Sequence, residues 1–387
     1  MFAARLARMT ESPILAMARK RRELVAAGHD VIALNIGEPD FDTPDHIRAA
    51  AKRAIDAGHT HYPPVAGLAE LRAAIARKLR EENGLDYAPD EIVVTGGAKQ
   101  ALANAMFALL EKGDEVILPA PYWVAYRGLV ELVGATAVIV PATIDDGWRV
   151  PPQRLAAAIT EKSRLLILNT PGNPSGVVLK ESELAAIAEL VRAHPRLMVI
   201  SDEIYEYILF DGARMHSIAA LNGMRERVIT VNGFSKGFAM TGWRLGYAAA
   251  ARPLAAAIAK MQGAFTAGAN SIAQHAAIAA LEGPRDAVED MVRTYAERRR
   301  FVMQRLRAIE GVRAVAPEGA FYVLADVSAD GGEDDAALCD RLLAERHVAL
   351  TPGGAFGAPG TVRISFAASR ADLAEGLNRF AAGLAAS

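Results

Sequence analysis

The most reactive side chain that this sequence suggests is a lysine set among small and aromatic residues. Lys236 lies within Asn232-Gly-Phe-Ser-Lys-Gly-Phe-Ala-Met-Thr-Gly-Trp-Arg244, directly after an apolar run. Such neighbours form a crowded pocket, and removing an ammonium group from water lowers its pKa from about 10.4 toward that of a reactive amine. The alternative is an ordinary surface lysine, which these neighbours disfavour. We therefore treat Lys236 as a candidate reactive amine.

Several further polar or glycine-rich positions follow apolar runs in the same way. Gly96-Gly97-Ala98-Lys99 opens a helical stretch, where small residues allow backbone N–H groups to approach an anion. Asn173 lies in a Pro/Gly loop, and Asp202 and Tyr205 follow a buried run. Singly, each is as well explained by a tight turn, a turn-tolerant asparagine or a helix cap. Together with Lys236 and the arginine eight residues after it, they form the set that a cationic heterocycle bearing a phosphate and a carbonyl would need.

The elements that must position these residues alternate through the middle of the chain. The predicted strands are Glu91–Thr95, Glu115–Leu118, Ala137–Val140, Leu165–Asn169, Met198–Ser201, Val228–Val231 and Arg244–Ala248. Helical spacing marks Ala98–Leu110 and Glu181–Ala193 between them. Strands that are apolar on both faces and separated by helices predict an α/β fold, with a mostly parallel sheet sandwiched by helices. Ligands of such sheets bind beyond the carboxyl ends of the strands, where the polar positions lie.

The pattern changes near residue 286, which predicts a second domain. A long helical stretch rich in Glu and Arg leads to a strand at Ala320–Asp326, a helix at Asp335–Glu345 and a strand at Val362–Phe366. We expect a large domain over residues 46–285 and a smaller α+β domain over residues 286–387. Residues 1–45 are expected to form an N-terminal arm and part of the small domain.

Composition and charge disfavour several classes of partner. The chain of 387 residues carries 43 basic and 45 acidic side chains, so a broad electrostatic surface for nucleic acid or an anionic membrane is not expected. The first eleven residues carry charges where a signal peptide needs an apolar stretch, and the uncharged stretch Met261–Leu281 is too polar for lipid. A single cysteine, Cys339, excludes an internal disulfide framework. We expect a cytoplasmic protein that binds neither nucleic acid nor membranes.

Two other kinds of site lack their sequence signatures. No G-x-G and no G-x-x-x-x-G-K-[ST] occurs, so NAD or ATP bound in those standard ways is not expected. His59-x-His61 has no third ligand in its pattern, so no metal site is predicted.

The ordered motifs of this chain resemble those of one family. The run from Gly233 through Lys236 and Arg244 to Gly246 matches the lysine signature of class I/II aminotransferases, which are pyridoxal-phosphate enzymes of fold type I. Further landmarks follow in the family's order: Asn35-Ile-Gly-Glu-Pro-Asp40, Tyr62-Pro-Pro-Val-Ala-Gly67, Pro121-Tyr-Trp123, Asn173-Pro-Ser-Gly176, Ser201-Asp-Glu-Ile-Tyr205 and Val362-Arg-Ile-Ser365. The resemblance spans about residues 12–380, nearly the whole chain.

The resemblance implies a role for each residue around the cofactor ring. Lys236 would form the Schiff base with the aldehyde of pyridoxal 5'-phosphate and then shuttle a proton. Asp202 would face the pyridine nitrogen and keep it protonated, which makes the ring an electron sink. Tyr205 and Asn173 would hydrogen-bond the phenolic oxygen, and Trp123 would stack on the ring face.

The phosphate would be held by the backbone of the helix start and by charged groups. The residues implied are Gly97, Ala98, Lys99 and Arg244. Many relatives place a serine three residues before the lysine, where this chain has Gly233, while Ser235 adjoins the lysine; which hydroxyl reaches the phosphate stays open. Tyr62 resembles the tyrosine that family members donate to the neighbouring subunit's phosphate, which implies a homodimer with shared active sites.

The resemblance also implies how an amino acid or 2-oxo acid would bind. Arg363 would clamp the α-carboxylate bidentately, helped by the backbone of Gly37, with Trp123 and Asn173 also lining the substrate. Lys99 stands where the bacterial aspartate aminotransferase branch places a lysine near the distal carboxylate, which favours aspartate and glutamate. The alternative is that Lys99 only supports the phosphate.

The resemblance thus implies an aminotransferase with a ping-pong mechanism, and alternatives remain. Relatives with similar motifs accept prephenate, aromatic or other amino acids, and a β-lyase or a ring-forming synthase can be built on the same fold. A cofactor-binding transcriptional regulator would need an added helix-turn-helix domain, for which the segment before the main domain has no room. A nicotinamide oxidoreductase is disfavoured because G-x-G is missing.

Overall fold

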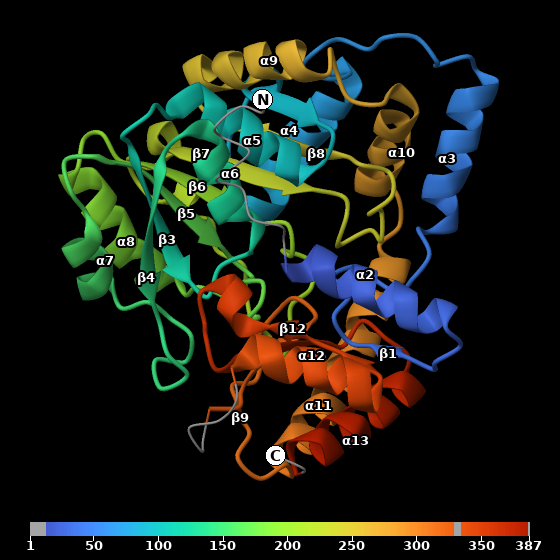
Figure 1. Ribbon diagram of the computed structural model, residues 1–387. Helices are drawn as coiled ribbons and strands as arrows, with labels where there is room; N and C mark the ends of the chain where they lie inside the picture. Colours follow the sequence, from blue (N-terminus) through green and yellow to red (C-terminus); the bar gives the residue numbers. More distant parts are fainter. Residues whose placement is uncertain (1–12, 329–333, 386–387) are drawn as a thin grey trace, which may run out of the picture.

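The computed structural model describes residues 13–328 and 334–385. The charged segment at residues 1–11 and the start of the predicted N-terminal arm lie outside the described residues. A seven-stranded sheet with its helices occupies one half of the molecule, and the carboxyl-terminal helices and strands occupy the other (Figure 1). None of the helices in the described part of the chain is long and apolar enough to cross a membrane.

The large sheet is mostly parallel, as the sequence predicted. Its strands are, in spatial order, β2 (Ile92–Thr95), β8 (Gly246–Ala249), β7 (Val228–Gly233), β6 (Met198–Asp202), β5 (Ser163–Asn169), β3 (Glu115–Ala120) and β4 (Thr136–Pro141). β8 runs antiparallel to both of its neighbours, and the other pairings are parallel. The carboxyl ends of β2, β5, β6 and β7 therefore lie along one edge of the sheet.

The predicted strand over residues 244–248 is shifted in the structure. Pairing begins at Gly246, two residues later than predicted. Arg244 adopts a left-handed backbone with φ 53°, which is incompatible with a strand. The sequence pattern does not show that the backbone enters the sheet only at Gly246, so the pattern alone placed the start of the strand too early.

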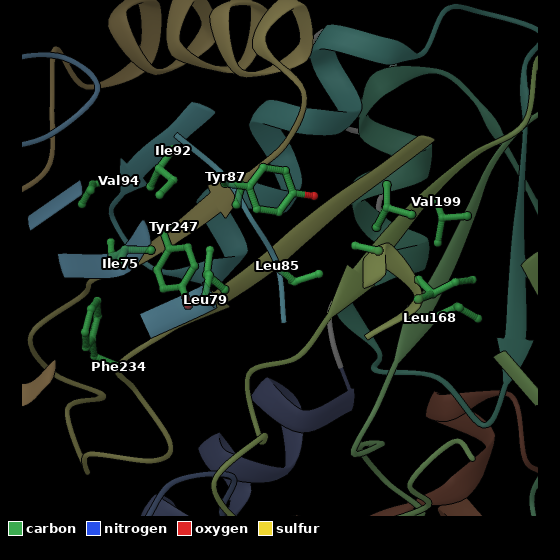
Figure 2. Close-up of a cluster of buried hydrophobic side chains, with 14 of the residues drawn as sticks. Ile75, Leu79, Leu85, Tyr87, Ile92, Val94, Leu168, Val199, Phe234 and Tyr247 are labelled. Carbon is green, nitrogen blue, oxygen red and sulfur yellow. The ribbon is translucent and has the colours of Figure 1, made fainter. Parts of the chain in front are cut away.

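Helices cover both faces of this sheet, because each presents an apolar side to it. One buried cluster draws on α3 (Asp45–Asp56), α4 (Ala69–Asn83), α7 (Pro152–Ala158), α8 (Glu181–Ala193) and α10 (Ser271–Glu282). The opposite face packs against α5 (Ala98–Leu109), α6 (Ala125–Val133) and α9 (Arg252–Phe265). In the first cluster, Tyr87, Ile92 and Tyr247 gather at one end of the sheet while Leu168 and Val199 lie further along it (Figure 2). Burying such side chains stabilises each by about 1.5–3 kcal/mol.

A second core lies in the half that holds the carboxyl terminus. A four-stranded antiparallel sheet has the order β12 (Thr351–Pro352), β13 (Thr361–Ser365), β10 (Tyr322–Asp326) and β9 (Arg313–Ala314). Near it, β1 (Ile32–Ala33) pairs in parallel with β11 (Val348–Ala349). The surrounding helices are α2 (Pro13–Ala26), α11 (Asp286–Arg307), α12 (Asp335–Arg346) and α13 (Arg370–Leu384). Leu34, directly after β1, accepts a backbone hydrogen bond from the Ser365 N–H of β13, so this N-terminal segment is part of the second core. The domain boundaries at residues 45 and 285 stay predictions.

Short 3-10 helices connect several of these elements. They are Pro89–Glu91, Ile218–Ala220, Arg225–Arg227 and Gly353–Phe356.

Candidate active site

Polar side chains from both cores meet beyond the carboxyl ends of the central strands. Asp202 ends β6, Asn173 follows β5, and Lys236 lies in the turn after β7. Arg363 comes from β13 of the other sheet, and it donates a hydrogen bond from Nη1 to Asn173 Oδ1 at 3.0 Å. The site therefore forms where the carboxyl edge of the large sheet faces the smaller one.

Lys236 is half-buried, and its ammonium is held by a distant backbone group. Its Nζ donates a hydrogen bond to the carbonyl oxygen of Gly37. The same Nζ lies 5.8 Å from the ring centroids of Tyr205 and Phe321. Burial lowers the pKa of Lys236 to about 8, and the positive charge of Arg363 contributes in the same direction. An appreciable fraction of this amine is therefore neutral near physiological pH, as a nucleophile or proton acceptor requires.

Asp202 is 3% exposed and receives two hydrogen bonds. The Tyr126 hydroxyl donates to its Oδ2 at 2.7 Å, and the Ile204 N–H donates to its Oδ1 at 3.3 Å. Burial raises the pKa of Asp202 to about 6, although both hydrogen bonds and the Lys236 charge oppose the shift. The carboxylate is thus ionised above that pH, and a cationic partner beside it would stabilise the charged form.

Tyr205 is buried, with its hydroxyl 2.9 Å from that of Tyr322. Burial is the main reason that the pKa of Tyr205 lies well above its ordinary value, so the side chain stays a neutral hydroxyl. A neutral hydroxyl can donate one hydrogen bond to an anionic oxygen while it accepts another.

Arg363 is 2% exposed and lacks an acidic partner among residues 13–328 and 334–385. Besides Asn173, its guanidinium donates to the Asn35 carbonyl oxygen at 2.8 Å and to Thr351 Oγ1 at 3.3 Å. Its Nε–H is buried without an acceptor. A buried guanidinium without a carboxylate is costly unless an anion arrives, so this side chain is poised to receive one.

A crowded glycine-rich turn lies at the start of α5. A Cβ placed on Gly97 would lie 2.7 Å from Arg244 Nη2, and one on Gly246 would lie 2.4 Å from the Ala98 nitrogen. The backbone and the guanidinium therefore approach each other as closely as glycine permits. Lys99 Nζ lies 4.9 Å from the ring centroid of Trp123, and burial together with Arg244 lowers the pKa of Lys99. These groups form an electropositive helix start suited to a phosphate.

Two further residues predicted to bind the phosphate differ in exposure. Tyr62 is 92% exposed, and its hydroxyl has no hydrogen-bond partner within the described ranges. Ser235 is buried beside Lys236, whereas Gly233 has no room for a serine, because a Cβ there would lie 2.8 Å from the Gly246 Cα. Of the two positions discussed for a phosphate-binding hydroxyl, this chain can offer only Ser235.

The histidines and the cysteine lie outside the site. The rings of His59 and His275 stack with centroids 4.0 Å apart, and Cys339 is buried within α12. In the described ranges, no three His, Cys, Asp or Glu side chains gather closely enough to hold a metal ion.

Four residues that touch the site were missed by sequence reasoning. They are Tyr126, Tyr322, Asn35 and Thr351. Tyr126 lies in the first turn of α6, three residues after Trp123, and its closeness in sequence to that predicted ligand was a usable signal. Thr351 and Tyr322 reach the site through strand pairing: Thr351 lies opposite Arg363, and Tyr322 is its diagonal neighbour on the same face. Asn35 follows β1 and contacts Arg363 through its backbone carbonyl oxygen.

Comparison with known proteins agrees with this geometry. Residues 29–380 match the protein family described as aminotransferase class I and II. The chain is 48% identical over 380 residues to the bifunctional aspartate aminotransferase and glutamate/aspartate-prephenate aminotransferase of Petunia hybrida, covering 95% of this chain and 79% of that protein. It is 45% identical to the aspartate/prephenate aminotransferase of Cereibacter sphaeroides, over 98% of both chains. The crystal structure of the aspartate aminotransferase from Rhizobium meliloti superposes with a TM-score of 0.96 at 40% identity, covering 100% of this chain and 99% of that one.

Proposed function

Because the chain belongs to the class I and II aminotransferases, which depend on pyridoxal phosphate, we propose that it moves the amino group of an L-amino acid to a 2-oxo acid by a ping-pong mechanism, with aspartate and glutamate as favoured substrates. One observation carries this proposal: a buried guanidinium without an acidic partner in the described part of the chain, Arg363, faces a lysine whose pKa is lowered to about 8. An anion receptor beside a reactive amine is what an α-amino acid requires.

The groups at the site fit pyridoxal phosphate. The close approach of Gly97 and Arg244 makes a cradle that a Cβ would fill, which suits a phosphate. Asp202 offers an anionic partner for a protonated pyridine nitrogen, and Tyr205 offers a neutral hydroxyl for a phenolic oxygen. Lys236 supplies the amine for an aldehyde. When bound, the cofactor supplies a ring that withdraws the electron pair left by a broken bond at the substrate Cα.

Side chains of the protein would hold the cofactor ring in place and transfer the proton. Lys236 Nζ would take the proton from the substrate Cα, leaving the electron pair to the ring, and would deliver it to the carbon that carries the aldehyde in the free cofactor. Asp202 keeps the ring nitrogen protonated, and Tyr126 holds the carboxylate ionised and in place. Asn173 hydrogen-bonds the phenolic oxygen together with Tyr205.

The remaining contacts hold the phosphate and the ring. The backbone at Gly97 and Ala98 binds the phosphate, with the Arg244 guanidinium and the Ser235 hydroxyl beside it. Trp123 would hold the cofactor ring by stacking on one of its faces.

The substrate is bound through its carboxylates. Arg363 pairs with the α-carboxylate, and the Gly37 backbone and Asn173 line the same position. Lys99, above Trp123, pairs with the distal carboxylate of aspartate or glutamate. A prephenate or aromatic substrate is the second candidate, favoured by the prephenate activity in the names of the Petunia and Cereibacter relatives. A β-lyase reaction is the third.

We also propose that the protein works as a homodimer in the cytoplasm. Tyr62 is 92% exposed and Phe265 is 52% exposed, and aromatic side chains are enriched at subunit interfaces. Tyr62 would then reach the phosphate of the partner's site.

A half-reaction panel tests the function. The protein loaded with pyridoxal phosphate is mixed with single amino acids, and loss of its visible absorbance band is followed without an amino acceptor. Aspartate and glutamate should bleach the band fastest and yield one keto acid per site, and a 2-oxo acid should restore it. Continuous keto acid release without an acceptor would instead identify a lyase.

A further inference from the structure

We propose that Tyr322 is a positioning residue that links the two halves of the site, the tyrosine that binds the cofactor and the arginine that binds the substrate carboxylate. This inference rests on the proposed function of Tyr205 and Arg363. Tyr322 itself was not among the residues expected from the sequence. It begins β10, is fully buried, and touches both partners.

The hydroxyl of Tyr322 contacts the cofactor side of the site. It lies 2.9 Å from the Tyr205 hydroxyl, and 3.1 Å from where a Cβ on Gly37 would stand. A tyrosine hydroxyl carries a single hydrogen. When Tyr205 donates its hydrogen to the phenolic oxygen, the bond between the two tyrosines must be donated by Tyr322. That donation polarises the Tyr205 hydroxyl and strengthens the hydrogen bond that Tyr205 donates to the phenolic oxygen.

The ring of Tyr322 supports the substrate side. The Arg363 guanidinium carbon lies 4.5 Å from the centroid of the Tyr322 ring and 5.0 Å from that of Phe356. Strand register explains this, because Tyr322 pairs with Ser365 and Arg363 lies two residues before Ser365 on the same face. A cation held on an aromatic face keeps its N–H groups directed outward, toward an incoming carboxylate.

Tyr322 thus contacts Tyr205 through its hydroxyl and Arg363 through its ring, so the two contacts can be tested separately. Tyr322→Phe removes the hydroxyl and keeps the ring. Tyr322→Leu removes both. Tyr295→Phe is the matched control, because Tyr295 is equally buried and packs on Phe321 with centroids 5.4 Å apart, yet contacts neither Tyr205 nor Arg363.

The first measurement is a pH titration of the visible absorbance of the cofactor-loaded protein. A weaker Tyr205 hydrogen bond stabilises the anionic phenolic oxygen less, so the pKa of the lysine nitrogen joined to the cofactor should rise by about half a unit in Tyr322→Phe. The second is the dissociation constant of succinate, a dicarboxylate without an amino group. It should stay within about twofold in Tyr322→Phe and weaken roughly 3- to 30-fold in Tyr322→Leu.

The outcomes separate this proposal from the proposed function. A wild-type protein that develops no visible band with pyridoxal phosphate would refute the function itself. With a normal wild-type band, an unshifted pKa in Tyr322→Phe, or an equal shift in Tyr295→Phe, would overturn the link to Tyr205. Unchanged succinate affinity in Tyr322→Leu would overturn the link to Arg363. Thermal melting of the cofactor-free variants checks folding. Should Tyr322→Leu fail to fold, Tyr322→Met, which also removes the ring, replaces it in the succinate measurement, and the same loss of affinity is expected.

Discussion

The hydroxyl of Tyr126 donates a hydrogen bond to Asp202 Oδ2 at 2.7 Å in a fully buried setting. Tyr126 comes from α6, and Asp202 ends β6, so a helix that covers the sheet holds the carboxylate of a strand. The pKa of Asp202 is raised to about 6 by burial, and the Tyr126 bond limits that rise. The pKa of Asp202 therefore depends on Tyr126, a residue of the helix that covers the sheet.

Removing this bond should shift the pH dependence of cofactor binding. Tyr126→Phe leaves the ionised form of Asp202 less stabilised, so the pKa of Asp202 should rise by about one unit above 6. As the pH is lowered, protonation of Asp202 removes the partner of the ring nitrogen. Pyridoxal phosphate affinity, measured by absorbance between pH 5 and 9, should therefore begin to fall at a higher pH in Tyr126→Phe than in the wild type. Tyr122→Phe, a nearby buried tyrosine that does not contact Asp202, is the control. Superimposable profiles for Tyr126→Phe and the wild type would contradict this role.

Lys99→Ala separates the two roles considered for this lysine. If Lys99 pairs with the distal carboxylate, kcat/KM for aspartate and glutamate should fall roughly 10- to 100-fold, the loss of a charge-assisted hydrogen bond, while aromatic substrates change little. Lys260→Ala, an exposed lysine on α9, should change neither. Equal losses for both substrate classes, with weaker cofactor binding, would assign Lys99 to the phosphate.

Gly246→Ala should damage the phosphate cradle. The new Cβ would lie 2.4 Å from the Ala98 nitrogen and 2.7 Å from the Gly97 carbonyl carbon, so the helix start must move. Cofactor affinity should fall about 5- to 150-fold, since overpacking of this kind costs roughly 1–3 kcal/mol. In Gly242→Ala, a change in the same loop, the new Cβ would meet no atom within 4 Å among the described residues beyond its chain neighbours, and this variant should bind the cofactor normally. Normal affinity in Gly246→Ala would mean that the cradle is not the phosphate site.

Mixing two inactive variants tests whether active sites are shared. Tyr62→Ala and Lys236→Ala each place their defect in a different half of a shared site. A mixed dimer would contain one intact site and one doubly defective site, so an equal mixture should recover about a quarter of the wild-type activity, given random pairing in a twofold dimer. Either variant alone stays inactive or nearly so. Lack of recovery, with mixed dimers shown by mass spectrometry, would mean that Tyr62 does not serve the partner subunit.

The sequence was sufficient to predict the seven strands of the large sheet and several helices, and it supplied a set of candidate site residues. Strands and helices are encoded in short-range apolar periodicity, which is why Glu181–Ala193 was predicted with the bounds that the structure has. Lys236, Asp202 and Asn173 could be found because each lies at the end of a strand or within four residues after it, and the carboxyl ends of parallel strands reach the same edge of the sheet. Apolar periodicity and the position of a residue at the end of a strand can be recognised without knowing which strands pair.

Tertiary structure alone decided which side chains meet. The order of the strands, the reversed direction of β8 and the placement of Arg363 against Asn173 depend on how two separate cores pack, because 190 residues separate those two side chains. Tyr322 entered the site through the register between β10 and β13, and a shift by one residue would turn its ring to the other face. Apolar periodicity constrains which face a side chain takes, but the partner across the strand is chosen by the packing of the whole chain.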